Sequence, residues 1–379
     1  MKVLLIPNLV EYHAVSMKRY ADELTQALHQ ITPPGWELDS LTCHHVALAA
    51  KLLPGNLGAK TAERLGRLVK YPLVVKKNRY RGDIFHILDH SHAHLLKSLP
   101  AERTVISCHD IIPLLASLGK LDIAISDNQR RAFPKIIANL EAAQEVITIS
   151  ESSKQNLLEH TKIPAERLHV VYFGINPNFT PEPTEAPTLA EERVLIRKRY
   201  NIPENARLLM HVGTTGRYKN TIALIKLLKA LGDDVWLLRV GSPFHEDEAA
   251  LVEQLGVGER IVHAGKIPSD GLLGAHYRAA DMFVFPSLWE GLGLPPLEAM
   301  ACGTPTITSN TASLPEVAGP NGITFSPQDD EEIARVTDSL LRDPARLAKL
   351  GSDGLAWSKN FTWQQSAQQT LRVYEKIGK

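Results

Sequence analysis

The chain has 379 residues, of which 44% are hydrophobic and 22% charged, a composition typical of a globular protein with more than one hydrophobic core. Its 42 basic and 42 acidic side chains give a net charge of zero, so no overall field attracts nucleic acid, and no nucleic-acid partner is expected. The three cysteines are Cys43, Cys108 and Cys302, which are too far apart for a zinc ribbon or a disulfide framework and favour reduced thiols.

No apolar segment approaches the length that crosses a bilayer, and the first run, 1–7, ends at a proline. We therefore expect a cytoplasmic protein.

Short apolar runs rich in β-formers alternate with amphipathic helical stretches, the pattern of a parallel sheet covered by helices on both faces. The predicted strands are 2–6, 37–42, 84–88, 104–107, 146–149, 168–172, 207–212, 235–240, 282–285 and 305–308. They form two sets, separated by the proline-rich stretch 177–187, which we interpret as an interdomain linker.

Between Lys51 and Arg81 the sequence holds nine basic residues and one acid, Glu63, with leucines and valines interleaved. Such a stretch can form a basic amphipathic helix on an anionic bilayer. A soluble helix whose apolar side joins the core explains the same pattern, because single basic faces are common. We therefore expect either peripheral attachment to the inner face of the membrane or a soluble helix that packs on the core.

Further along, His90, His92 and His94 alternate in the sequence, which places them on one face only if the segment is extended. No carboxylate or cysteine cluster accompanies them, so we predict no metal site. His109 and Asp110 end a predicted strand, and ligands of open parallel sheets gather at the carboxyl ends of strands.

Two glycine-rich turns carry the strongest chemical signals. In 211–220, glycines at a strand-to-helix turn precede Arg217 and Lys219, which suits a diphosphate, although an ordinary βα turn with surface cations has the same pattern. In 285–305, Glu290 and Glu298 bracket a second such turn, and carboxylates accept strong hydrogen bonds from sugar hydroxyls.

The segment from Glu290 to Pro305 reads Glu-Gly-Leu-Gly-Leu-Pro-Pro-Leu-Glu-Ala-Met-Ala-Cys-Gly-Thr-Pro. It resembles the Glu-x7-Glu signature of family 4 of the retaining glycosyltransferases. The resemblance implies the GT-B fold, an α/β architecture of two doubly wound Rossmann-like domains facing across a cleft. Residues 1–183 would form the acceptor-side domain and 188–360 the donor domain, with the C-terminal helix 361–379 returning to the first domain.

The resemblance also implies roles for single residues. Glu290 would contact donor-sugar hydroxyls and Glu298 the ribose, while Lys219 would hold the diphosphate. His109 begins a His-Asp-Ile-Ile-Pro stretch like the family's, whose histidine lies near the sugar and the α-phosphate. Arg217 stands one position before the family's arginine, where this chain has Tyr218.

Expected catalytic residues are thus His109, Lys219 and Glu290. Expected donor-binding residues are Gly213, Arg217, Lys219, Asn220, Gly241, Ile267, Glu290, Gly291, Leu292, Gly293, Leu294 and Glu298. Expected acceptor-side residues are Tyr12, His13, His90, His92 and Asp110.

The implied activity is retaining, metal-independent, hexosyltransferase-type transfer from a nucleotide sugar, a substrate and not a cofactor, to an unknown glycan, polysaccharide or lipid-linked acceptor. A nucleotide-sugar epimerase of the same fold and a non-catalytic nucleotide-sugar-binding protein are the alternatives. Double displacement would need a carboxylate nucleophile, for which only Asp110 is available. A dinucleotide-dependent oxidoreductase is excluded, because no G-x-G-x-x-G follows the first strand. The oligomeric state is not predicted.

Overall fold

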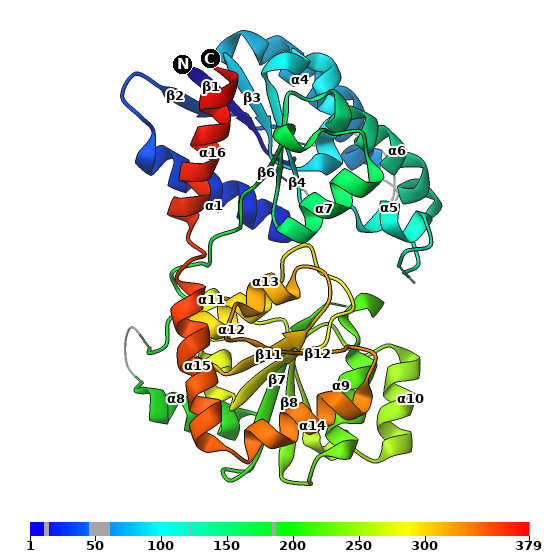
Figure 1. Cartoon of the computed structure of the whole chain (residues 1–379), viewed down its shortest axis with the longest axis vertical. Coiled ribbons are helices and arrows are strands. Elements are labelled where there is room, and N and C mark those ends of the chain that lie inside the picture. Colours follow the sequence, from blue (N-terminus) through cyan, green and yellow to red (C-terminus); the bar gives the residue numbers. More distant parts are fainter. Residues whose placement is uncertain (11–14, 45–60, 122, 184–186, 215, 379) are drawn as a thin grey trace. The chain divides into compact units, whose positions relative to one another are not determined.

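The computed structural model describes residues 1–10, 15–44, 61–121, 123–183, 187–214 and 216–378. It divides into two compact units, 1–174 with 363–379 (unit 1) and 175–362 (unit 2) (Figure 1). Each unit is built on its own six-stranded parallel sheet. Within the ranges given above, no helix combines the length and the apolar character needed to cross a membrane.

In unit 1 the strand order is β2-β1-β3-β4-β5-β6, and all pairs are parallel. The strands are β1 (Lys2–Ile6), β2 (Glu37–Ser40), β3 (Ile84–Ile87), β4 (Thr104–Cys108), β5 (Glu145–Thr148) and β6 (Leu168–Val170). The helices are α1 (Val15–Ile31), α4 (Tyr71–Asn78), α5 (Ile112–Ser117), α6 (Asp127–Ala142), α7 (Glu151–His160) and α16 (Trp363–Ile377). The central strands are buried on both faces, which is why they read as continuous apolar runs.

The last helix, α16, packs against α1 in unit 1 (Figure 1). Its Tyr374 hydroxyl lies 2.6 Å from Nδ1 of His86 on β3, and both side chains are buried. Gly174, where unit 1 is interrupted, leaves no room for a side chain, because a Cβ there would lie 2.2 Å from the backbone nitrogen of Trp363. Helix α16 is therefore an integral part of unit 1.

Unit 2 has the order β12-β11-β10-β7-β8-β9, again all parallel. Its strands are β7 (Arg207–Gly213), β8 (Val235–Gly241), β9 (Ile261–Gly265), β10 (Met282–Phe285), β11 (Thr306–Ser309) and β12 (Ile323–Phe325). Its helices are α8 (Leu189–Arg199), α9 (Thr221–Ala230), α10 (Glu246–Leu255), α11 (Asp270–Ala279), α12 (Leu294–Ala301), α13 (Leu314–Ala318), α14 (Asp330–Leu341) and α15 (Pro344–Ser358).

Successive side chains of β7 face opposite layers of unit 2. Leu209 packs with apolar residues of α9 and α14, whereas Leu208 and Met210 pack with those of α8, α11 and α12. This alternation is what a strand covered by helices on both faces requires.

Two features differ from the sequence-based expectation. The proline-rich stretch is not a free linker along its length, because Phe179 is buried in the core of unit 2 against Tyr277. The chain therefore changes units at Gly174, before the predicted linker begins. Strands β9 and β12 are also absent from the predicted set, since one is a half-exposed edge strand and the other has three residues.

Candidate active site

The strand order of unit 2 reverses between β7 and β10, and ligands of open α/β sheets bind at such a switch point, beyond the carboxyl ends of the strands. Lys219 follows β7 and Glu290 follows β10. The Lys219 Nζ atom lies 2.7 Å from Oε1 of Glu290, and the two side chains are only 9% and 11% exposed. The fold thus brings together the two residues on which the sequence-based prediction of the donor site depends.

Lys219 is positioned by the short turn that ends in Asn220. Asn220 adopts a left-handed conformation, φ 54°, and its side-chain amide donates to the carbonyl oxygens of Pro286 and Pro327 at 3.1 and 2.8 Å. The amide of Leu288 also donates to the carbonyl of Tyr218 at 2.7 Å. The bonds with Pro286 and Leu288 fix the lysine turn to the loop that carries Glu290, so the pair is preorganised, and the bond to Pro327 ties the turn to the segment after β12.

The electrostatic balance at Lys219 favours a charged ammonium group. Burial acts to lower the pKa of Lys219, but the Glu290 carboxylate more than offsets it, so the pKa lies above its usual value. The ammonium nitrogen also lies 5.1 Å from the ring centres of Tyr218 and Phe285. A permanent, poorly hydrated cation of this kind can stabilise negative charge on a ligand.

The loop after β10 turns sharply into α12. Gly293 precedes that helix with φ 104°, a conformation that residues with a side chain rarely adopt. The buried Ser313 hydroxyl bonds to the carbonyl oxygens of Glu290 and Leu292 at 3.0 and 2.8 Å. These two carbonyl oxygens therefore point toward Ser313. The loop then leads into the N-terminus of α12, and backbone amides at a helix N-terminus favour anions.

Glu298 lies inside α12 and is only 6% exposed. Its Oε2 atom accepts a hydrogen bond of 3.0 Å from the hydroxyl of Tyr277, a buried residue of α11. The second glutamate of the sequence motif is therefore held in place within unit 2 before any ligand arrives.

At the ends of β7 and β8 the backbones approach closely. A Cβ at Gly241, which has φ 116°, would lie 2.0 Å from the carbonyl oxygen of Gly213, so only glycine fits there. Ile267 follows β9 and packs against the apolar cluster that contains Val240 and Phe285. Arg217 instead forms an ion pair with Asp247, at 2.5 Å, in which both side chains are about half exposed.

Two buried polar side chains near the carboxyl ends of β7 and β8 were not predicted as site residues. His211 on β7 stacks on Phe285, and neither of its ring nitrogens finds a hydrogen-bond partner among the described residues. Arg239 on β8 is 1% exposed, and its guanidinium lies 4.8 Å from the ring centre of Phe244. Burial, with the Arg239 and Lys219 cations nearby, keeps the pKa of His211 well below its usual value, so the imidazole is neutral.

Unit 1 has its own switch point, between β1 and β3. There the side-chain amide of Asn8 donates to Oδ2 of Asp89 at 2.9 Å, and the amide of Ser91 donates to Oδ1 at 2.7 Å. Burial acts to raise the pKa of Asp89, but the His90, His109 and His92 rings and the Ser91 amide lower it to about 2. A buried carboxylate thus organises the loop that carries the predicted acceptor-side histidines.

His109 follows β4 and is 2% exposed. Its Nε2 atom lies 2.9 Å from the carbonyl oxygen of Leu88, while Nδ1 has no partner among the described residues. Burial lowers the pKa of this imidazole, which therefore stays neutral. The neighbouring Asp110 accepts a 3.0 Å bond from the amide of Ile112, which begins α5.

The three alternating histidines have separate partners. His90 Nδ1 accepts from the amide of His109 at 3.3 Å, His92 Nδ1 lies 3.0 Å from the Ser91 hydroxyl, and His94 Nε2 lies 2.9 Å from the carbonyl oxygen of Arg67. In the part of the chain that the structure describes, no three side chains of the metal-binding types come together. Tyr12 and His13, also predicted on the acceptor side, lie outside the described residues.

The sequence analysis did not predict several residues that hold the candidate site residues in place. Asp89, Ser313 and Arg239 carry no recognisable spacing to a predicted ligand group. Asp89 offered one usable signal, because it directly follows a predicted strand.

Solved structures with the same fold cover the whole chain. Sucrose-phosphate synthase from Thermosynechococcus elongatus matches with a TM-score of 0.77 and 22% identity, over 100% of this chain and 99% of that chain. HepE from Anabaena, in complex with UDP and glucose, matches with a TM-score of 0.73 and 18% identity, over 99% and 100%. Two Rossmann-like parallel-sheet domains with these neighbours define the GT-B class of glycosyltransferase fold.

Proteins that are similar in sequence include mannosyltransferases. The serotype-specific mannosyltransferase WbdA of Escherichia coli is 31% identical over 292 residues, which are 74% of this chain and 35% of WbdA. O-antigen chain mannosyltransferase B of Escherichia coli is 26% identical over the full length of both chains. The chain therefore spans about a third of the length of WbdA, and the whole of the second relative.

Two family models match successive parts of the chain. The model described as Glycosyltransferase Family 4 matches residues 11–179, and the one described as Glycosyl transferases group 1 matches 192–357. The chain belongs to these glycosyltransferases, and the expectation of a family 4 member with a GT-B fold is confirmed.

Proposed function

We propose that this chain transfers a sugar from a nucleotide-sugar donor to a hydroxyl group of a glycan, with retention of configuration at the anomeric carbon. The observation that carries the proposal is the buried Lys219–Glu290 pair, 2.7 Å apart at the switch point of unit 2. A cation and a carboxylate there provide the two groups that a sugar diphosphate needs, one for each end of the bond that breaks.

In the proposed reaction the bond between the anomeric carbon and the diphosphate oxygen breaks, and a bond from the acceptor oxygen to that carbon forms on the same face. The acceptor proton passes to the departing diphosphate, so no oxidant, reductant or further reactant is needed. Lys219 and the amides of Gly291, Leu292, Gly293 and Leu294 would stabilise the diphosphate charge. These groups are supplied by the protein, so we propose that no metal is required.

The remaining contacts follow from the motif positions. Glu290 would accept hydrogen bonds from sugar hydroxyls and Glu298 from the ribose, with Gly213, Asn220, Gly241 and Ile267 shaping the turn around the nucleotide. Arg217 stands one position before the family's arginine, and its surface pair with Asp247 supports a smaller role than that of Lys219. On the acceptor side we propose His109, which has a free Nδ1 among the described residues. Asp110 follows it in the sequence, and His90 contacts the backbone amide of His109 and lies, with His92, in the segment His90–Ser98.

The similarity to named glycosyltransferases supports a proposal for the donor sugar and for the acceptor. Mannosyltransferases, among them WbdA and the O-antigen chain enzyme, make mannose the first donor sugar to test. The O-antigen relative supports a glycan acceptor. We propose that the acceptor is carried on a lipid and is met at an anionic membrane surface, on the cytoplasmic side.

Thermal-shift screening of nucleoside diphosphates and nucleotide sugars, including UDP-glucose and GDP-mannose, tests donor binding, because a ligand that binds the native state raises its stability. Donor consumption with an acceptor panel then separates three functions. A transferase releases nucleoside diphosphate and a glycosylated acceptor, an epimerase returns an isomeric donor, and a binding protein leaves the donor unchanged. Either of the last two results rejects the proposal.

A further inference from the structure

The segment 61–81 is an unusually basic part of a chain whose net charge is zero. It contains seven basic residues and one acid, Glu63. Residues 61–78 are helical, with a five-residue π-helical turn, Gly66–Lys70, leading into α4. Lys51 and Lys60, at the start of the basic stretch in the sequence, lie outside the described residues.

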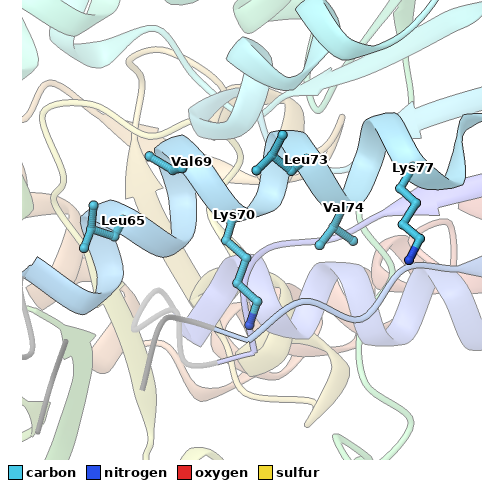
Figure 2. A pocket seen from close by; sticks show the side chains of 6 residues that line it. All are labelled: Leu65, Val69, Lys70, Leu73, Val74 and Lys77. Carbon is cyan, nitrogen blue, oxygen red and sulfur yellow. The ribbon is translucent and has the colours of Figure 1, made fainter. Parts of the chain in front are cut away.

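Four large apolar side chains on this segment face solvent. Leu65, Leu68, Val69 and Leu73 are 40%, 44%, 53% and 63% exposed. Figure 2 shows Val69 and Leu73 along one edge of the helix and Lys70, Val74 and Lys77 along the other. Together with Leu65 they line an open hollow of about 460 Å³. Isolated exposed leucines are ordinary, but four within nine residues on one helix form a patch.

The opposite side of the helix is fixed to the domain. Tyr71 and Val75 are fully buried, and the Tyr71 hydroxyl donates to the carbonyl oxygen of Pro7 at 2.5 Å. The carbonyl oxygen of Arg67 lies 2.9 Å from Nε2 of His94. The segment therefore already has a packed apolar side, so its exposed apolar residues are a second, outward face.

Cations border this outward face. Arg64, Lys76, Lys77 and Arg79 are exposed and form no ion pair with other described residues, whereas Arg81 pairs with Asp39. Apolar side chains flanked by cations without acidic partners match an anionic lipid surface, where the chains enter the interface and the cations meet headgroups. A second protein chain would bury these cations, at a cost in desolvation, unless it supplied acids to pair with them.

We propose that the outward face of 61–80, formed by Leu65, Leu68, Val69 and Leu73 with Arg64, Lys76, Lys77 and Arg79, docks on an anionic lipid bilayer. The helix packs directly on the segment His90–Ser98, which holds the proposed acceptor-side histidines. Docking would thus present that loop to acceptors at the bilayer. The link to a lipid-borne acceptor rests on the proposed function, but lipid binding itself can be measured without sugar transfer.

Co-sedimentation of the full chain with vesicles tests the proposal. We expect the protein to pellet with mixed phosphatidylglycerol–phosphatidylcholine vesicles and not with pure phosphatidylcholine. Lys76→Glu with Lys77→Glu should lower the partition coefficient by at least about thirtyfold, because each cation near anionic lipid contributes about a factor of five. Leu73→Glu should lower it by at least about tenfold, since a leucine that would enter the bilayer interface is replaced by a charge. High salt should weaken binding of the unaltered chain without abolishing it.

Matched changes on α8 serve as controls. Leu195, 55% exposed, resembles Leu73, and the adjacent exposed pair Lys198 and Arg199 resembles Lys76 and Lys77. Leu195→Glu, and Lys198→Glu with Arg199→Glu, should leave vesicle binding unchanged. Because all these side chains face solvent, the variants should fold, which circular dichroism and donor-induced thermal shifts would verify.

Three results would overturn the proposal. The first is equal pelleting with neutral and anionic vesicles, and the second is equal loss of binding in the α8 variants. The third is a concentration-dependent dimer that Leu73→Glu dissociates, with no vesicle binding by the unaltered chain. A chain that binds vesicles but no nucleotide would refute the proposed function and leave the lipid surface intact.

Discussion

The Nζ atom of Lys219 lies 2.7 Å from Oε1 of Glu290, and neither side chain is more than 11% exposed. The two charges therefore neutralise each other at the centre of the proposed donor site. An arriving diphosphate would compete with the carboxylate for the ammonium group, which would free Glu290 to accept hydrogen bonds from sugar hydroxyls. This coupling predicts that the two residues contribute together to donor binding.

Glu290→Gln should reduce kcat/KM by a factor that corresponds to about 1.5–3 kcal/mol, because a charge-assisted hydrogen bond to the donor is replaced by a neutral one. The fold should survive, since the amide fills the same space. Steady-state kinetics with the best donor, alongside circular dichroism, measures this. Near-normal turnover would remove Glu290 from the proposed site.

Lys219→Ala should weaken nucleoside-diphosphate binding far more than Arg217→Ala. The lysine is buried against Glu290, whereas Arg217 holds an exposed ion pair, and exposed pairs contribute little. Titration calorimetry on the two variants compares them directly.

Lys219→Ala also leaves the Glu290 charge buried without its partner, which lowers stability. The double change Lys219→Met with Glu290→Gln restores neutrality and separates folding from binding. A larger loss of affinity in the Arg217 variant would show that the arginine, in its shifted position, is the principal diphosphate ligand.

Turnover should survive exhaustive treatment with EDTA. Lys219 and the start of α12 supply positive charge where a carboxylate-lined site would need a divalent cation. Activity that disappears with EDTA and returns with manganese or magnesium would contradict the proposal. It would also direct attention to Asp89 and the histidines of unit 1.

Acid should destabilise unit 1 before most carboxylates titrate. Burial lowers the pKa of His86 and of His92 to about 3, below the value of 6.5 that each has when unfolded. Between those values the unfolded chain binds more protons than the native chain, so stability falls as pH decreases through this window and is fully present above about 6.5.

The expected slope for these two histidines is about 2.7 kcal/mol per pH unit below pH 6. Urea unfolding of unit 1, followed through amide exchange in β3 and β4, measures it between pH 7.5 and 4.5. The lowered pKa of Asp89 adds a further loss only below about pH 4. A stability that does not change between pH 6.5 and 4.5 would show that the two rings are not buried as neutral groups.

Much of this architecture was predictable because parallel strands are short apolar runs with clear boundaries. The prediction 282–285 for β10 matches its observed bounds, and that for β1 does as well. β9 was not predicted because its side chains are half exposed at the sheet edge, and β12 was not predicted because three residues give no periodicity. Phe179 misled the linker prediction, since a single buried aromatic residue among prolines leaves no pattern.

The residues of the candidate site also include some that the sequence predicts and some that it does not. Glu290 and Lys219 stand in glycine-rich motifs, and the resemblance of these motifs to family 4 drew attention to them. The residues that hold them depend on long-range contacts: Ser313 bonds to Glu290 across 23 positions, and Asn220 to Pro327 across 107. Sequence cannot reveal such partners until the strand order is known.

The anomeric configuration of the product is the most direct test of the central claim. Once a donor and an acceptor are found, proton NMR of the reaction mixture reads the configuration of the new linkage. We expect an α-linked donor to give an α-linked product, with release of nucleoside diphosphate, and we expect Glu290→Gln to slow its appearance without changing its configuration. An inverted linkage, or an epimerised sugar still attached to the nucleotide, would contradict the assignment of a retaining glycosyltransferase.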